Sequence, residues 1–276
     1  MLPVNHTRWQ LAQRLTCDPA AAFDGLCPYG ATKPGPVQSR WFLQPKMMKR
    51  MKRFALVSFS DRMLAKLTRP SLKDFVEIHP EYDLMFEEEA LLDTRDFHPA
   101  WNKLAYARRA MILGSYEAVV CLDDDILITE PLVDPIGKAI NEHFGPPGKL
   151  VIASLDEQVN TRVPFNTGVL ILKSSPKTLL MLDEVFKFGR RLVKLVNGHS
   201  WLPRVSGLWD QDAFADYINF NGKENFVLLP HGQLQTFVRS GQALPQAVFA
   251  MHFTGLSDLE PQRRIEFLRR VILTLQ

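Results

Sequence analysis

The 276-residue sequence predicts one α/β domain, with a mixed, mostly parallel central sheet flanked by helices. The first observation is that short apolar runs, each ended by small, polar or acidic residues, alternate with segments of helical apolar spacing. The second is the composition, with 46% hydrophobic and 23% charged residues, which is typical of globular proteins. The third is the length, which allows a substantial core without disulfides.

Residues 1–45 are predicted to form an irregular extension packed on this domain, which itself spans 46–276. Repeated proline and glycine in the extension favour turns over long elements. The three cysteines, Cys17, Cys27 and Cys121, are too few for a secreted disulfide framework. Cys121 stands in an apolar run and is expected to be a buried hydrophobic residue.

The strands are predicted from short apolar runs. Residues 53–60 are apolar and end in small polar residues, and residues 117–122 run directly into three aspartates. Residues 168–172 follow Asn166 and Thr167, which read as a turn. The predicted strands are 53–60, 82–86, 117–122, 150–154, 168–172, 226–229 and 248–253.

The helices are predicted from apolar residues that share one face. Residues 61–78 show this spacing, but Pro70 is expected to break the helix in two. Residues 99–113 begin with a proline in the first turn. Residues 261–275 carry an apolar stripe of Ile265, Leu268, Ile272 and Leu275, which predicts packing on the sheet or on a second subunit. The predicted helices are 61–78, 99–113, 178–195, 210–218 and 261–275.

The strongest functional signal is the triplet Asp123-Asp124-Asp125 between two apolar runs. Repulsion and desolvation make three adjacent carboxylates costly there unless a cation compensates them. Ligands bind at the carboxyl ends of strands in open α/β sheets. Asp123 and Asp125 are two residues apart and share one side if the strand continues, which suits Mg²⁺ or Mn²⁺.

Two other interpretations of the triplet remain open. One is a solvated acidic turn between two strands. The other is a phosphohydrolase of the haloacid dehalogenase type, although Ile126 and Leu127 follow Asp125 where those enzymes have a small residue and then Thr or Val.

Leu122-Asp-Asp-Asp125 resembles the Asp-x-Asp motif of glycosyltransferases with the GT-A fold. His98-Pro-Ala-Trp-Asn-Lys-Leu104 resembles the Trp-x-Lys helix of the galactosyl-, mannosyl- and xylosyltransferase family. By that resemblance Lys103 approaches the nucleotide or its phosphates. An ammonium group neutralises a diphosphate as a point charge, although an ordinary surface lysine is the alternative.

Three further segments follow in the order of that fold. Asn166-Thr167-Gly168 resembles the Asn-x-Gly segment that bends close to the donor sugar. Asp210-Gln211 resembles the pair that faces the anomeric carbon in glycogenin-like transferases. Asp210 also suits a helix N-cap, and Asp212 or Asp210 would serve as general base if the reaction inverts configuration.

The last segment, Ala250-Met-His-Phe-Thr-Gly255, resembles the His-Phe-x-Gly segment that supplies the third metal ligand. His252 would bind the ion, and Gly255 would let backbone N–H groups approach the diphosphate. The lysine that often follows in the family is replaced by Leu256-Ser257. The alternative for His252 is a hydrogen-bonded core histidine.

The resemblance implies a metal-dependent glycosyltransferase that transfers a sugar from a nucleotide-diphosphate donor to a glycan or glycoprotein. Asp123, Asp125 and His252 would hold Mn²⁺ or Mg²⁺, and Ser58, Ser60 and Asp124 would contribute to donor binding. The family favours UDP-sugars, and UDP-xylose and UDP-galactose are the leading expectations. A candidate acceptor loop is 197–207, where Trp201 could stack on a sugar.

Other function classes are kept as alternatives. The triplet could serve a nucleotidyltransferase or a phosphohydrolase, or the chain could bind a nucleotide sugar or glycan without turnover. Helix 261–275 could also dock its arginines on an anionic membrane or a partner. The net charge of +3 gives no reason to expect nucleic acid.

No run approaches the roughly 18 to 20 apolar residues of a membrane span, and no signal peptide is apparent. The expectation is a soluble protein of a bacterial or virus-infected cytoplasm. The Golgi lumen is expected only if a membrane anchor was removed.

Overall fold

The computed structural model describes part of the chain, and the account below concerns that part. For 190–196, 200–203 and 261 it describes the backbone only. The predicted extension 1–45 and the start of the predicted domain lie outside the described residues, so both boundaries stay predictions. The described residues are 52–93, 97–145, 147–156, 163–196, 200–203, 209–238, 243–246, 248–253 and 261–275.

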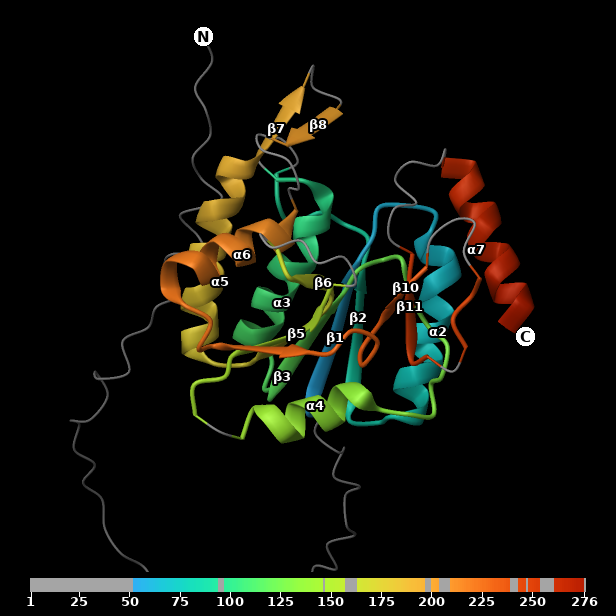
Figure 1. The fold of residues 1–276 in the computed structure, drawn as a ribbon, viewed down its shortest axis with the longest axis horizontal. Helices are drawn as coiled ribbons and strands as arrows, with labels where there is room; N and C mark the ends of the chain where they lie inside the picture. Colours follow the sequence, from blue (N-terminus) through green and yellow to red (C-terminus); the bar gives the residue numbers. More distant parts are fainter. Residues whose placement is uncertain are drawn as a thin grey trace, which may run out of the picture. The chain divides into compact units, whose positions relative to one another are not determined.

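Eleven strands form three sheets within these residues (Figure 1). They are β1 (Phe54–Phe59), β2 (Tyr82–Glu87), β3 (Ala118–Leu122), β4 (Ile126–Ile128), β5 (Val151–Leu155), β6 (Phe165–Lys173), β7 (Val193–Val196), β8 (Ser200–Pro203), β9 (Phe226–Leu229), β10 (Thr236–Phe237) and β11 (Ala250–His252).

The described helices are labelled as in Figure 1. They are α2 (Ala65–Ile78), the 3₁₀ helix η1 (Pro99–Trp101), α3 (Asn102–Leu113), α4 (Pro135–His143), α5 (Pro176–Leu192), α6 (Asp210–Asn221) and α7 (Pro261–Leu275). None of them is long and apolar enough to cross a membrane.

The central sheet has the strand order β2-β1-β3-β6-β5-β9. β2, β1 and β3 are parallel to one another, and β5 is parallel to β9. Only β6 runs antiparallel to its neighbours in this sheet. The predicted mixed, mostly parallel sheet is therefore confirmed. A smaller sheet, β10-β11-β4, begins where β3 ends, and β7 pairs with β8 as a hairpin.

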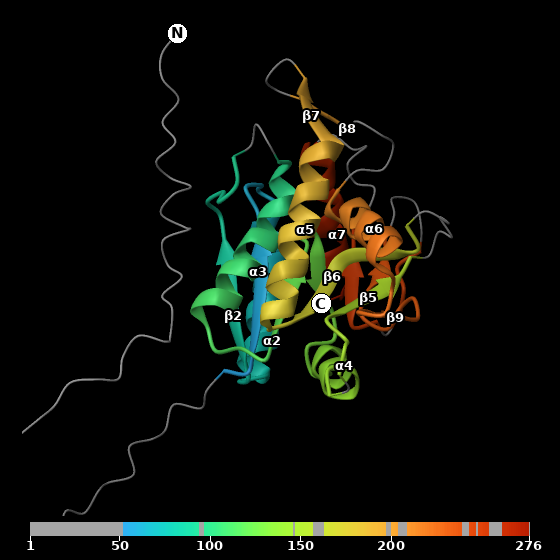
Figure 2. The same ribbon diagram turned by 90° about the vertical axis from the view of Figure 1, so that its left-hand side faces the viewer.

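The residues of β1 show how both faces of the central sheet are buried. Alternate side chains point to opposite faces of a strand. Ala55 and Val57 therefore join the apolar cluster of α3, α5 and α6, while Phe54 and Leu56 join that of α2 and α4. Figure 1 shows the sheet between α3, α5 and α6 on one side and α2 on the other, and Figure 2 shows α3 and α5 covering their face.

The C-terminal helix α7 packs beside α2 and against the smaller sheet. Leu268 and Val271 are buried with Met251 and Phe253 in a third apolar cluster. The predicted stripe is wrong at its end, because Leu275 is exposed.

Several predicted elements need correction. Pro70 lies inside one continuous helix, α2, whose Leu72 and Phe75 are buried in the core. Proline removes one backbone donor there, and burial of the apolar face holds the helix together. Asn166 and Thr167 belong to β6 instead of a turn, opposite a register shift in β5.

Candidate active site

The acidic triplet occupies the junction between the two sheets. β3 delivers Asp123 at its carboxyl end, and β4 resumes one residue after Asp125. His252 reaches the same place because β11 pairs antiparallel with β4, with His252 opposite Ile126. Long-range strand pairing thus joins ligands that are more than 120 residues apart in the sequence.

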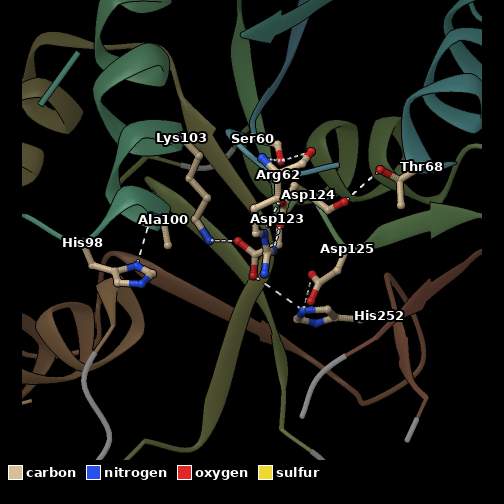
Figure 3. A network of polar contacts seen from close by, with 10 residues as sticks. All are labelled: Ser60, Arg62, Thr68, His98, Ala100, Lys103, Asp123, Asp124, Asp125 and His252. Carbon is tan, nitrogen blue, oxygen red and sulfur yellow. Dashed lines mark hydrogen bonds and ion pairs between the residues drawn. The ribbon is translucent and has the colours of Figure 1, made fainter. Parts of the chain in front are cut away.

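Asp123, Asp125 and His252 form a compact group of possible metal ligands. One ligand atom of each lies within 4.8 Å of the others. His252 Nε2 is 3.2 Å from Asp125 Oδ1 and 3.5 Å from Asp123 Oδ2 (Figure 3). Two carboxylate oxygens and one imidazole nitrogen suit Mn²⁺ better than Mg²⁺, which prefers oxygen alone.

The two charges of this group stabilise each other. Burial alone would lower the pKa of His252, but the carboxylates of Asp125 and Asp123 outweigh it and raise that pKa. Burial alone would raise the pKa of Asp125, but the nearby imidazolium and Arg62 lower it. An ionised carboxylate is the form that binds a cation.

Gly168 in β6 leaves the space that the His252 ring occupies. An ideal Cβ on Gly168 would lie 2.3 Å from His252 Cε1 and 2.5 Å from its Nδ1. Only a residue without a side chain fits there. The close approach at this glycine therefore includes a candidate metal ligand, and the approach to a donor sugar that the resemblance implies stays a prediction.

Lys103 connects the triplet to helix α6. It is only 2% exposed, and its Nζ contacts Asp123 Oδ1, lies 2.9 Å from Asp210 Oδ2 and donates to the Thr167 carbonyl at 2.9 Å. Burial alone would lower the pKa of Lys103, but the two carboxylates raise it. The surface-lysine interpretation is wrong, because the ammonium group lies inside the site.

The two aspartates in the first turn of α6, Asp210 and Asp212, have different surroundings. Asp210 lines the cavity, is buried, and has a raised pKa because of that burial. The N-cap is Trp209, so the capping role considered for Asp210 is wrong. Asp212 Oδ2 accepts a hydrogen bond from Trp209 N at 3.1 Å and does not line the cavity. Its geometry is that of a capping carboxylate. Gln211 lines the cavity.

Asp124 is engaged by residues from the end of β1. Ser60 Oγ donates to Asp124 Oδ2 at 2.5 Å, and Arg62 Nε donates to the same oxygen at 2.8 Å. Burial raises the pKa of Asp124 despite this guanidinium. The backbone is fixed as well, since Thr68 Oγ1 donates to the Asp124 carbonyl at 2.8 Å. Asp124 therefore orients Arg62 at the cavity wall.

Two other predicted donor-binding residues differ in position. Asn166 lines the cavity, and its Oδ1 accepts hydrogen bonds from Gly168 N at 2.7 Å and from Gln235 Nε2 at 3.0 Å. Ser58 is fully buried in β1 and does not line the cavity, so it is not placed to contact a nucleoside. Gly255 and most of the predicted acceptor loop lie outside the described residues.

These residues enclose a cavity of about 650 Å³, within the range of ligand pockets. Several residues of the cavity lining were not predicted from the sequence. His98 stands in the quoted segment 98–104, directly before the proline that opens a helix, and Trp209 directly precedes the quoted pair Asp210-Gln211. Arg62 belongs to no quoted motif, and Arg264 was considered only among the arginines of helix 261–275 that could dock on an anionic surface. The lining residues that were not predicted for the site include Arg62, His98, Trp209 and Arg264.

No protein-family model and no curated protein matches the sequence. Solved structures do match. A glycosyltransferase involved in glycosylation of the major capsid of PBCV-1 is 18% identical, with a TM-score of 0.59 over 79% of this chain and 99% of that chain.

Two further structures are similar at lower scores. The glycosyltransferase GlyE of Streptococcus pneumoniae is 12% identical over 79% of this chain and 60% of its own, with a TM-score of 0.45. The galactosyltransferase LgtC is 12% identical over 79% of this chain and 95% of its own, with a TM-score of 0.38. The match to the PBCV-1 capsid glycosyltransferase and the acidic cluster beside β3 agree with the sequence resemblance, and the chain has the GT-A glycosyltransferase fold.

Proposed function

We propose that this chain is a metal-assisted glycosyltransferase that uses a nucleotide-diphosphate sugar. The observation that carries the proposal is the convergence of Asp123, Asp125 and His252 at the edge of a 650 Å³ cavity. Asp210 and Lys103 stand beside them. The GT-A fold supports this reading over a phosphohydrolase.

In the proposed reaction, the bond between the anomeric carbon and the diphosphate oxygen breaks. A new bond forms between that carbon and an acceptor hydroxyl oxygen, whose proton leaves to a base. A divalent ion held by the three ligands would offset the charge that develops on the departing diphosphate. The leaving group keeps the bonding electron pair.

The residues of the chain position the reactants. Asn166 and Asp210 line the cavity with groups that bind sugar hydroxyls. Lys103 holds Asp210 and Asp123 in fixed positions, so these groups need little reorganisation during the reaction. Arg62 offers a cation at the cavity wall, oriented by Asp124.

We further propose a uridine diphosphate sugar as the donor, with UDP-xylose and UDP-galactose first, and a glycan or glycoprotein as the acceptor. The sequence resemblance supports this choice. Mn²⁺ is preferred over Mg²⁺ because one ligand is an imidazole.

The test is calorimetric titration with UDP- and GDP-sugars, in Mn²⁺ and in chelator, on the wild-type chain and Asp125→Asn. Asp74→Asn is the matched control, because it is the same isosteric change at an exposed position of α2 that does not line the cavity. We expect one nucleotide sugar to bind the wild-type chain only when metal is present. Its affinity for the control variant should equal that for the wild type, and its affinity for Asp125→Asn should be at least tenfold lower. Equal binding in chelator, or no binding of any nucleotide sugar, would contradict the proposal.

A further inference from the structure

Trp209 is a large aromatic side chain in the wall of the cavity. It is 44% exposed and directly precedes Asp210. An exposed indole at the rim of such a site is suited to contact a ligand with an apolar face.

The indole is held in place from two sides. Its ring centroid lies 4.2 Å from that of His98, at an interplanar angle of 60°. His98 is oriented in turn by Ala100 N, which donates to His98 Nδ1 at 3.2 Å. The backbone of Trp209 is fixed by Asp212, which accepts from its N and donates its own N–H to its carbonyl, both at 3.1 Å. A ligand surface fixed in advance loses little entropy on binding.

The position of Trp209 separates it from the metal ligands. In Figure 3, His98 and Lys103 lie on one side of Asp123, whereas Asp125 and His252 lie on the other. Trp209 packs on His98 and adjoins Asp210, so it stands at the end of the cavity where the donor sugar is proposed to bind. The diphosphate would occupy the opposite end, beside Asp125 and His252.

We propose that Trp209 forms the acceptor subsite, on which the ring of a carbohydrate acceptor stacks. This inference rests on the proposed transferase function. One face of a sugar ring presents C–H groups, which pack on the negative face of an indole. An acceptor hydroxyl held there would reach the anomeric carbon beside Asp210. The acceptor is therefore a sugar residue of a glycan instead of an amino-acid side chain.

The kinetic test compares Trp209→Ala, Trp209→Phe and the wild type with the donor that binds in calorimetry, Mn²⁺, and xylobiose, lactose or methyl α-mannoside as acceptor. The matched control is Phe220→Ala, an exposed aromatic of the same helix away from the cavity. We expect kcat/KM for the acceptor to fall at least tenfold in Trp209→Ala. The aromatic variant and the control should stay within about threefold, and the donor KM should hold within about twofold throughout.

A parallel increase of the donor KM in Trp209→Ala would show that the indole stacks on the nucleobase, and would overturn the proposal. Unchanged acceptor kinetics would overturn it as well. Thermal unfolding of each variant separates these results from misfolding. If the alanine variant does not fold, Trp209→Leu replaces it, because leucine keeps an apolar side chain and removes the aromatic face, and it should show the same loss for the acceptor.

Acceptor contact is also measurable without donor or turnover. Saturation-transfer NMR with the same three sugars should show contact in the wild type and in Phe220→Ala, and loss of contact in Trp209→Ala. This result would stand even if no nucleotide sugar bound, so failure of the donor proposal is distinguishable. Absence of contact with all three sugars in the wild type would overturn the acceptor subsite.

Discussion

Replacement of Gly168 by alanine tests whether the position of His252 governs metal binding. The added Cβ would lie 2.3 Å from His252 Cε1, whereas ordinary van der Waals contact begins at 3.4 Å. The imidazole must therefore recede by about 1 Å, the difference between these distances. It has little room, because His252 is 3% exposed and its ring packs against Phe237 at 5.6 Å.

The size of the effect follows from this displacement. Metal–ligand distances tolerate about 0.2 Å, so a shift of about 1 Å removes the nitrogen from the coordination sphere. We expect Gly168→Ala to bind Mn²⁺ on the order of 10- to 100-fold more weakly, as for disturbed outer-shell partners. Overpacking should also lower the free energy of unfolding by about 1–3 kcal/mol.

The assay is titration of Mn²⁺ into metal-free protein, followed by calorimetry and by the electron paramagnetic resonance signal of the free ion. Gly145→Ala is the matched control, because nothing lies within 4 Å of an ideal Cβ at that position. The control should bind Mn²⁺ like the wild type. Wild-type Mn²⁺ affinity in a folded Gly168→Ala protein would refute the reasoning, because it would show that this ring does not hold the ion.

Three further predictions concern His98 and Lys103 in the cavity lining and Asp134 at the start of α4. Burial and Arg62 lower the pKa of His98 to about 4 in the folded chain. Between about pH 6.5 and about pH 4, this histidine is therefore protonated in the unfolded chain and neutral in the folded chain. Stability should fall as pH drops from about 6.5 to about 4, and His98→Phe should flatten this dependence in pH-resolved denaturation; an unchanged slope would count against the buried neutral ring. Asp134→Ala should lower the free energy of unfolding, measured by urea titration, by about 2–4 kcal/mol. Asp134 Oδ1 accepts hydrogen bonds from Gly137 N and from Tyr82 Oη, which the alanine variant loses. Asp134→Asn should keep most of this stability. Lys103→Met should lower the melting temperature in chelator by leaving buried carboxylates unpaired, and Mn²⁺ should recover part of that loss; equal melting with and without Mn²⁺ would contradict the proposed site.

The features that sequence reasoning predicted are those with a local pattern. The strand before Asp123 was readable because its apolar run is short and ends in charge. Helix α3 was readable from Pro99 and its apolar spacing. Helix α4 was missed, although Asp134 followed by Pro135 is an N-terminal signal of this kind.

The features that it missed depend on contacts between distant segments. Arg62 donates a hydrogen bond to Asp124, which lies 62 residues further along the chain. The apolar periodicity of either segment does not predict this contact. Asn166 and Thr167 were predicted as a turn, although they belong to β6 beside an irregularity in its pairing with β5. Such a bulge depends on the partner strand, so the local sequence does not reveal it. The contact of Gly168 with His252 likewise appears only once β6 and β11 are placed in space.

The charge of the cavity gives an independent reason for a divalent ion. The described lining residues include five carboxylates and three permanent cations, which leaves an excess of two negative charges when His98 is neutral and His252 is the neutral imidazole that would bind a metal. A diphosphate sugar adds about two more negative charges, so its entry into this low-dielectric site would be unfavourable. A bound divalent cation would cancel this excess, while Lys103 and Arg62 remain paired with Asp123, Asp210 and Asp124. If the chain has the proposed function, this charge balance predicts that donor binding, as well as departure of the leaving group, depends on a divalent ion. The charged lining residues are Asp61, Asp123, Asp124, Asp125, Asp210, Arg62, Lys103 and Arg264.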